Sequence, residues 1–148
     1  MHLYDDLVVE PAIETVTLSA DGTTNGADHS AHLPATSSKF RQALCYIDVG
    51  TWTADGGTHT FKLQDAPDNG SGAAGTYADV PAARQVGPGT VVISDASNDN
   101  GQHYLGAMIG AGRPFVRVVA TVTGNGTGTL ADVEAHMILG DASPRPVR

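Results

Sequence analysis

The sequence has very little cysteine, few aromatic residues and no long apolar run. Its single cysteine, Cys45, excludes a disulfide within the chain. Because Cys45 lies among the apolar residues of an expected strand, we predict a buried thiol rather than a nucleophile. No stretch approaches the roughly 20 consecutive apolar residues that a membrane-spanning helix needs, and residues 1–6 lack the basic and apolar regions of a secretory signal. We therefore expect a protein that is made in the cytoplasm and has no membrane partner.

Positive charge is also scarce, and it is unevenly placed. The 148 residues carry a formal net charge of −8. Residues 1–38 contain six acidic residues and neither lysine nor arginine, whereas in residues 113–148 four arginines outnumber three acidic residues. A surface with this excess of negative charge repels a phosphate backbone, so we expect no nucleic acid partner. An acidic leading segment and a basic tail suit contact with another protein.

No group of residues predicts catalysis or a metal centre. Serines form no Gly-x-Ser-x-Gly elbow, and Asp132 and Glu134 share an exposed strand face that would not raise a carboxyl pKa for acid–base work. His29 and His32 are three residues apart, but zinc needs about four ligands, or three and a water. Residues 95–101 resemble a calcium loop without its closing glutamate. We expect no enzyme activity, no cofactor and no bound metal.

What the sequence does contain is a repeated alternation of apolar and polar residues, the pattern of half-buried β-strands. Residues 115–123 and 131–139 alternate most clearly, and the stretch rich in Gly, Asn and Thr between them predicts a β-hairpin. Residues 40–49 and 59–64 predict a second hairpin, with Cys45 and His59 on its inner face. Its histidine is expected to be a hydrogen-bonded structural residue. Further strands are expected at residues 15–19, 77–81, 89–94 and 103–109, with the one at 89–94 buried.

These strands predict the fold class and the division of the chain. No helical periodicity is sustained, and about eight strands with turn signals between them indicate an all-β, antiparallel β-sandwich with jelly-roll-like connections. We expect the sandwich domain to cover residues 15–140, with a long surface loop at residues 21–38. Residues 1–14, interrupted by Pro11, are expected to form an extended N-terminal arm. Residues 141–148 are expected to form an extended C-terminal tail.

Four stretches between residues 55 and 124 carry a recognisable pattern. They read DGGTHTFKLQD at residues 55–65, DNG and YADV at residues 68–70 and 77–80, and RPFVRVVATVTG at residues 113–124. Together with the opening LYDDL at residues 3–7, this pattern resembles that of small head-associated proteins of tailed bacteriophages, which decorate or cement the capsid. The chain departs from it in additions at residues 21–38 and 70–75. The resemblance implies a virion structural protein on the capsid surface, a homo-oligomer (dimer or trimer) that binds the major capsid protein and has no enzyme activity.

Two other functions stay open at this point. A phage tail or receptor-binding component would use the same fold, and a carbohydrate-binding β-sandwich module would use the loops around Trp52 and Tyr77. For the capsid hypothesis we expect the arm and the tail to contact the partner. The candidate partner-binding residues are Leu3, Tyr4, Leu7, Val8, Val9, Arg145 and Arg148.

Overall fold

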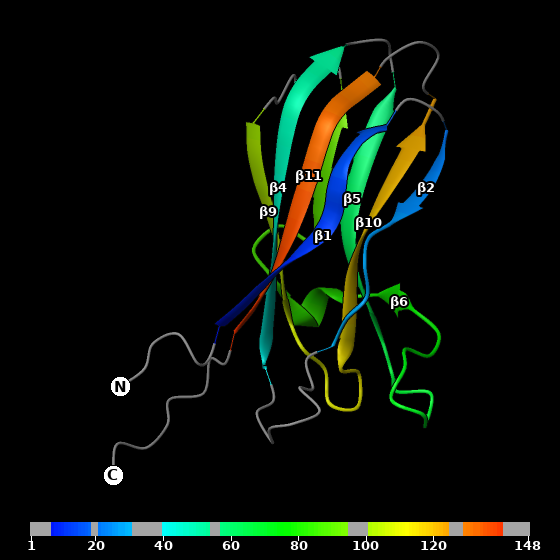
Figure 1. Cartoon of the computed structure of the whole chain (residues 1–148), viewed down its shortest axis with the longest axis vertical. Helices are drawn as coiled ribbons and strands as arrows, with labels where there is room; N and C mark the ends of the chain where they lie inside the picture. The colour runs from blue at the N-terminus through cyan, green and yellow to red at the C-terminus, as the bar shows by residue number, and fades with distance from the viewer. Residues whose placement is uncertain are drawn as a thin grey trace.

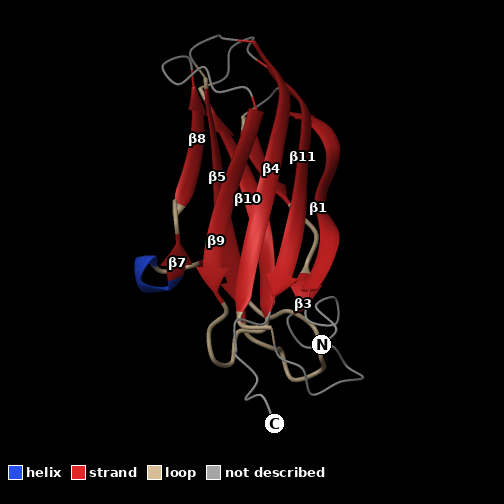
Figure 2. Cartoon of the chain, turned by 90° about the vertical axis from the view of Figure 1, so that its left-hand side faces the viewer, coloured by secondary structure: helices blue, strands red, loops and turns tan. Residues whose placement is uncertain are grey.

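The computed structural model describes residues 7–18, 21–30, 40–53, 57–94, 101–124 and 129–140. Within these ranges the chain forms eleven strands and one short 3₁₀ turn. They are β1 (Leu7–Leu18), β2 (Gly22–Asn25), β3 (His29–Ser30), β4 (Gln42–Thr53), β5 (Thr58–Ala66), β6 (Ala78–Asp79), η1 (Ala82–Arg84), β7 (Gln85–Val86), β8 (Thr90–Ser94), β9 (Gly101–Met108), β10 (Phe115–Thr123) and β11 (Thr129–Gly140). Figure 2 shows the helical turn outside the strands, next to β7.

The strands form two antiparallel sheets that pack face to face (Figure 1). The first sheet has the order β1-β11-β4-β9-β7, and the second has the order β2-β10-β5-β6, with β3 also beside β10 and β8 also beside β5. The eight described strands of four residues or more give the orders β1-β11-β4-β9 and β2-β10-β5-β8. This is the strand arrangement of a jelly roll. The predicted all-β sandwich with jelly-roll connections is confirmed.

Neither predicted hairpin is present, because the chain changes sheets at both places. β10 pairs with β5 and β2 in the second sheet, whereas β11 pairs with β1 and β4 in the first. β4 and β5 are likewise in different sheets. Alternation tells which side chains face the core, and a strand covered on one face has the same alternation whether the chain turns back or crosses over. The pairing partner therefore could not be read from the pattern.

The expectation of an arm over residues 1–14 is wrong for residues 7–14. These residues begin β1, which lies at the edge of the first sheet and pairs with β11 from Leu7 opposite Gly140 onward. Pro11 was taken as an interruption, but an edge strand tolerates proline because one side of its backbone needs no sheet partner. The register of β1 shifts directly after Pro11. Residues 1–6 of the expected arm lie outside the described residues.

The expected long loop at residues 21–38 is partly sheet. β2 pairs with the end of β10, and β3 pairs with its beginning. Between them, the Gly26 amide donates to the Val118 carbonyl and the Ala27 amide donates to the Ala12 carbonyl, so this segment bonds to both sheets. Short polar strands of this kind lack the apolar alternation that marks longer ones, which is why the sequence missed them. Residues 31–38, like the expected tail at residues 141–148, lie outside the described residues.

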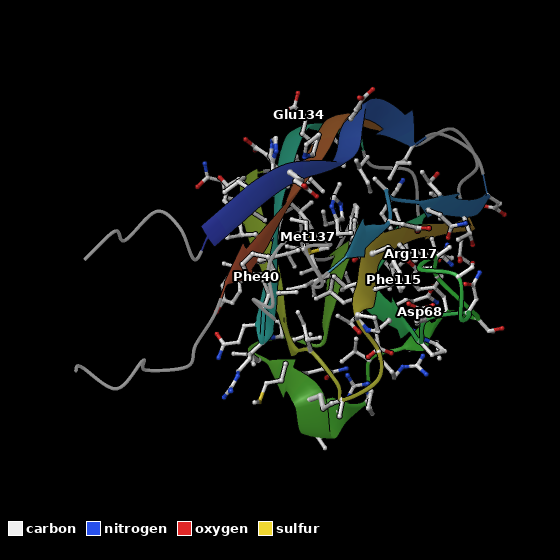
Figure 3. All side chains as sticks on the ribbon, turned by 60° about the horizontal axis from the view of Figure 1, so that its bottom comes forward. Phe40, Asp68, Phe115, Arg117, Glu134 and Met137 are labelled. Carbon is white, nitrogen blue, oxygen red and sulfur yellow. The ribbon has the colours of Figure 1, made fainter. Side chains whose placement is uncertain are left out.

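The core lies between the sheets and follows the predicted alternation. Its largest fully buried side chains include Phe61, Ile47 and Met137, from β5, β4 and β11. β10 is mostly valine and threonine, whose branched side chains suit strands. Figure 3 shows the division of faces on β11, where Met137 points between the sheets and Glu134 points away. The strand expected to be wholly buried at residues 89–94 differs, because Val92 is 46% exposed between two buried neighbours.

Candidate functional site

The outer face of the first sheet carries apolar side chains at positions where polar ones are usual. In register across the sheet, Val9 lies opposite Ile138, Ile138 opposite Leu44, Leu44 opposite Gly106, and Gly106 opposite Val86. The exposed fractions are 57% for Val9, 39% for Leu44 and 45% for Val86. One apolar row therefore crosses all five strands on the solvent side. Exposed apolar side chains gathered in this way are typical of docking surfaces for other proteins.

Glycine hollows this row into a groove. The lining residues are Gln42, Ala43, Leu44, Val86, Gly106, Ala107, Ile138 and Gly140, and the groove has a volume of about 250 Å³ with a largely apolar wall. A Cβ atom at Gly106 would lie 2.4 Å from the Val86 carbonyl oxygen, so only glycine allows β7 to approach β9 this closely. We call the space enclosed by these eight residues the apolar groove. Tyr104 and Met108 of β9, both about half exposed, lie one row to either side of it.

Tyr46 on β4 lies opposite Tyr104 on β9 and forms the row next to the groove. Beyond this row, the same face of the sheet carries acidic side chains. Asp48 on β4 lies directly opposite Glu134 on β11. Like charges in this position repel each other. The Nε2 atom of His136 lies 3.8 Å from a Glu134 carboxylate oxygen. Desolvation raises the pKa of Tyr46, and the negative charge of Asp48 raises it further. We call Asp48 and Glu134 the acidic row, and this row would favour a positively charged group on whatever binds the face.

Three of the predicted partner-binding residues, Leu7, Val8 and Val9, lie in a strand beside the apolar groove. Residues 7–9 start β1, with Leu7 opposite Gly140, the last residue of β11 and part of the groove wall. Figure 1 shows these two strand ends side by side. Val9 is exposed and lies on the apolar row, and its contact with a partner stays a prediction. Leu3, Tyr4, Arg145 and Arg148 lie outside the described residues, and so do the side chains of Leu7 and Val8.

Most of the residues that form the groove were not predicted from the sequence. Leu44 and Ile138 were outward positions in strands whose inward positions were correctly assigned. An apolar residue in an outward position of an alternating strand is a usable signal, and two such residues on neighbouring strands would have predicted this patch. The contribution of Val86 and Gly106 could not have been anticipated, because it depends on β7 pairing with β9.

The outer face of the second sheet is a polar network whose members bind one another. The Arg117 guanidinium carbon lies 3.9 Å from the centre of the Tyr77 ring, and two of its nitrogens donate to the Gln64 side-chain oxygen. Gln64 donates to Asp79, which also binds Lys62 at 3.2 Å. With one ring face covered by Arg117 and its hydroxyl buried, Tyr77 is poorly placed to stack on a sugar. The side chain of Trp52, the other proposed sugar contact, lies outside the described residues.

A buried ion cluster ties the loops together at one end of β5. The side chain of Asp65 is 5% exposed, and Arg113 and Arg84 each place a nitrogen 2.5 Å from one of its carboxylate oxygens. Arg113 also donates to the Asp65 main-chain carbonyl at 2.6 Å. Asp65 directly follows the strand predicted at residues 59–64 and belongs to β5. Both oxygens of the buried carboxylate are bound by a guanidinium group, which indicates a structural role.

The histidines occupy separate places. His59 is fully buried, with Nε2 3.2 Å from the Leu18 carbonyl oxygen, which confirms its expected place in the core. His29, expected in a polar loop, is buried instead, and its Nδ1 lies 2.8 Å from Glu10, which links β3 to β1. Among the described residues, no group of three or more histidine, cysteine or acidic side chains could hold a metal ion. His32 and most of the calcium-like stretch at residues 95–101 lie outside them.

Comparison with known proteins identifies no relative of this chain. No model of a known protein family matches the chain, and no curated protein sequence matches it. In the part of the chain that the structure describes, no helix is long and apolar enough to cross a membrane. The most distinctive surface is the exposed apolar groove beside the acidic row.

Proposed function

We propose that this protein is a virion structural protein of a tailed bacteriophage that decorates and stabilises the capsid by binding the major capsid protein. The observation that carries the proposal is the exposed apolar row on the first sheet at its β1 end, where Val9 is 57% exposed and lies outside the groove wall. Such a surface serves contact between proteins. The sequence resemblance to head-associated phage proteins supplies the identity of the partner.

The rest of the molecule suits this role. The two sheets pack on one shared hydrophobic core, and the described ends of β1 and β11, Leu7 and Gly140, lie opposite each other. On a symmetric shell, a modest contact repeated in every copy would stabilise the whole particle. The net charge of −8 disfavours contact with DNA and suits the outside of a DNA-filled shell.

Two rival functions can be compared with this one. A tail or receptor-binding component would use the same fold and the same apolar row, so capsid binding is the property that separates it from a decoration protein. The carbohydrate-binding alternative has less support, because Arg117 covers the ring of Tyr77.

A binding experiment tests the proposal. Purified protein is mixed with expanded capsids that lack it, assembled from the coat protein of the same phage, and bound protein is measured after sedimentation. We expect saturable binding with a fixed number of copies per capsid, and greater resistance of the filled capsid to heat. Val9→Glu should weaken binding, whereas Val92→Glu, at a similarly exposed valine of the other sheet, should not. Absence of capsid binding, together with affinity for a glycan array or for phage tails, would replace the proposal with the corresponding rival.

A further inference from the structure

The residues that line and flank the apolar groove indicate which kind of ligand would bind it. Its wall is largely apolar, formed by side chains such as Leu44, Val86 and Ile138. At one side the next row holds Tyr46 opposite Tyr104, and beyond these lies the acidic row of Asp48 and Glu134. A ligand that matches all three rows has small apolar side chains followed or interrupted by positive charge.

We propose that the groove binds residues 141–148 of a second copy of this chain. This segment reads DASPRPVR, with Pro144, Pro146 and Val147 to enter the groove and Arg145 and Arg148 to reach the acidic row. Two prolines in alternate positions favour the extended polyproline conformation, which loses little entropy on binding. Proline-rich segments are bound in this way by apolar grooves with aromatic side chains nearby. Proline also lacks an N–H group, so the segment fits the face of a sheet better than its edge.

Strand geometry favours a second copy over the same chain. β11 ends at Gly140, in the groove wall, and runs out of the sheet there. To lie in its own groove the segment would have to reverse direction, and a tight turn uses about four of the eight residues. The remaining four would span about 12 Å in an extended conformation. The six residue-to-residue steps from Gly140 back to Glu134 span about 20 Å of strand. All eight residues, entering from another copy, would span about 25 Å and could cover both rows.

Exchange of the segment between two copies gives a closed dimer in which each groove is filled. Each copy would contribute one segment and one groove, so the two contacts are equivalent by symmetry. This inference does not rest on capsid binding. It concerns how copies of the protein associate, and it would hold for a tail protein as well.

Complementation between two full-length variants tests the exchange. The first variant, Leu44→Glu, places a charge in the groove and leaves the segment intact. The second carries Arg145→Glu, Val147→Ser and Arg148→Glu, which alter the segment and leave the groove intact. Sedimentation equilibrium should show a dimer for the parent protein and at least a tenfold weaker association for each variant alone. An equimolar mixture of the two should regain a heterodimer, because one intact groove meets one intact segment. Val92→Glu, on the other sheet, should associate like the parent.

Several outcomes would overturn the proposal. One is a parent protein that is monomeric at about 0.1 mM, and another is a dimer that survives both sets of substitutions. A third is loss of association in each variant without recovery in the mixture, since docking in the same chain or a different interface would give that result. If circular dichroism shows that Leu44→Glu does not fold, binding of a synthetic peptide of residues 141–148 is measured instead. This peptide should bind the segment variant with shifts in the amide signals of Gly106 and Ile138, and a peptide with both arginines changed to glutamate should not.

Discussion

Asp65 and Arg113 are 48 residues apart in the chain, yet Arg113 binds both the carboxylate and the main-chain carbonyl of Asp65. Arg84 binds the other carboxylate oxygen. Its Nη1 atom also donates a hydrogen bond to the Met108 main-chain carbonyl oxygen at 3.3 Å. One buried carboxylate thus connects the end of β5, the turn η1 and the loop before β10. Arg84 therefore links the turn directly before β7 to the end of β9, beside the side of the apolar groove that Val86 forms.

Replacing Asp65 with asparagine should destabilise the fold. The substitution keeps the size of the side chain but leaves two arginines without their counter-charge, and the loss of one partner from a buried ion pair is strongly unfavourable. We expect the free energy of unfolding to fall by about 2–4 kcal/mol, measured by urea denaturation. Asp79→Asn is the matched control, because Asp79 and its partner Lys62 are about half exposed. Its effect should stay below about 1 kcal/mol, and equal losses for the two variants would contradict the structural role of the cluster.

His59 should make the fold sensitive to mild acid. Desolvation lowers the pKa of this buried histidine below its ordinary value of 6.5. In the unfolded chain His59 has its ordinary pKa of 6.5, so below pH 6.5 the unfolded chain binds a proton that the folded protein does not yet bind. The free energy of unfolding that is present above pH 6.5 is therefore lost as the pH falls toward the lowered pKa of the folded state. We expect Tm to fall between pH 7.5 and pH 5.5, and to fall less in His59→Gln. His136→Gln, at a histidine whose side chain is 43% exposed, should keep the pH dependence of the parent protein.

Cys45 should resist thiol reagents while the protein is folded. The side chain is completely buried, and burial raises the pKa of its thiol to about 12. Both the access of the reagent and the reactive thiolate form are therefore suppressed. At pH 8, reaction with Ellman's reagent should be slow in the native protein and should accelerate at least a hundredfold in 8 M urea. Rapid stoichiometric labelling of the native protein would show that Cys45 is more accessible than the structure indicates.

Gly106→Ala should displace β7 and disturb the groove. The new Cβ would lie 2.4 Å from the Val86 carbonyl oxygen, a main-chain atom that can move away only with its strand. We expect a loss of about 1–3 kcal/mol in the free energy of unfolding, the usual range for overpacking. The amide of Val86 should also exchange its hydrogen faster. Gly75→Ala is a suitable comparison, because its Cβ would meet the Pro67 carbonyl oxygen at 3.1 Å and a small adjustment relieves the contact.

The alternation of side chains was sufficient to determine much of the fold. The class, the sandwich and the inward positions of β4, β5 and β10 follow from apolar residues at every second place. The burial of Cys45 and His59 followed from the same pattern. Alternation depends only on residues close together in the chain. It indicates which face of a strand is buried, and it does not indicate which strands pair. It therefore predicted strands and core positions well, wherever the strands were long.

Strand partners, the ion cluster and the groove were decided only by the tertiary structure. Whether β10 continues into a hairpin or crosses to the other sheet depends on the packing of all eight long strands, which no short window of sequence contains. Asp65 meets Arg84 and Arg113 across separations in the chain that have no sequence signature. The groove exists because five strands align Val9, Ile138, Leu44, Gly106 and Val86 in one row. Side chains that are unremarkable one at a time become a binding surface only when the sheet places them next to each other.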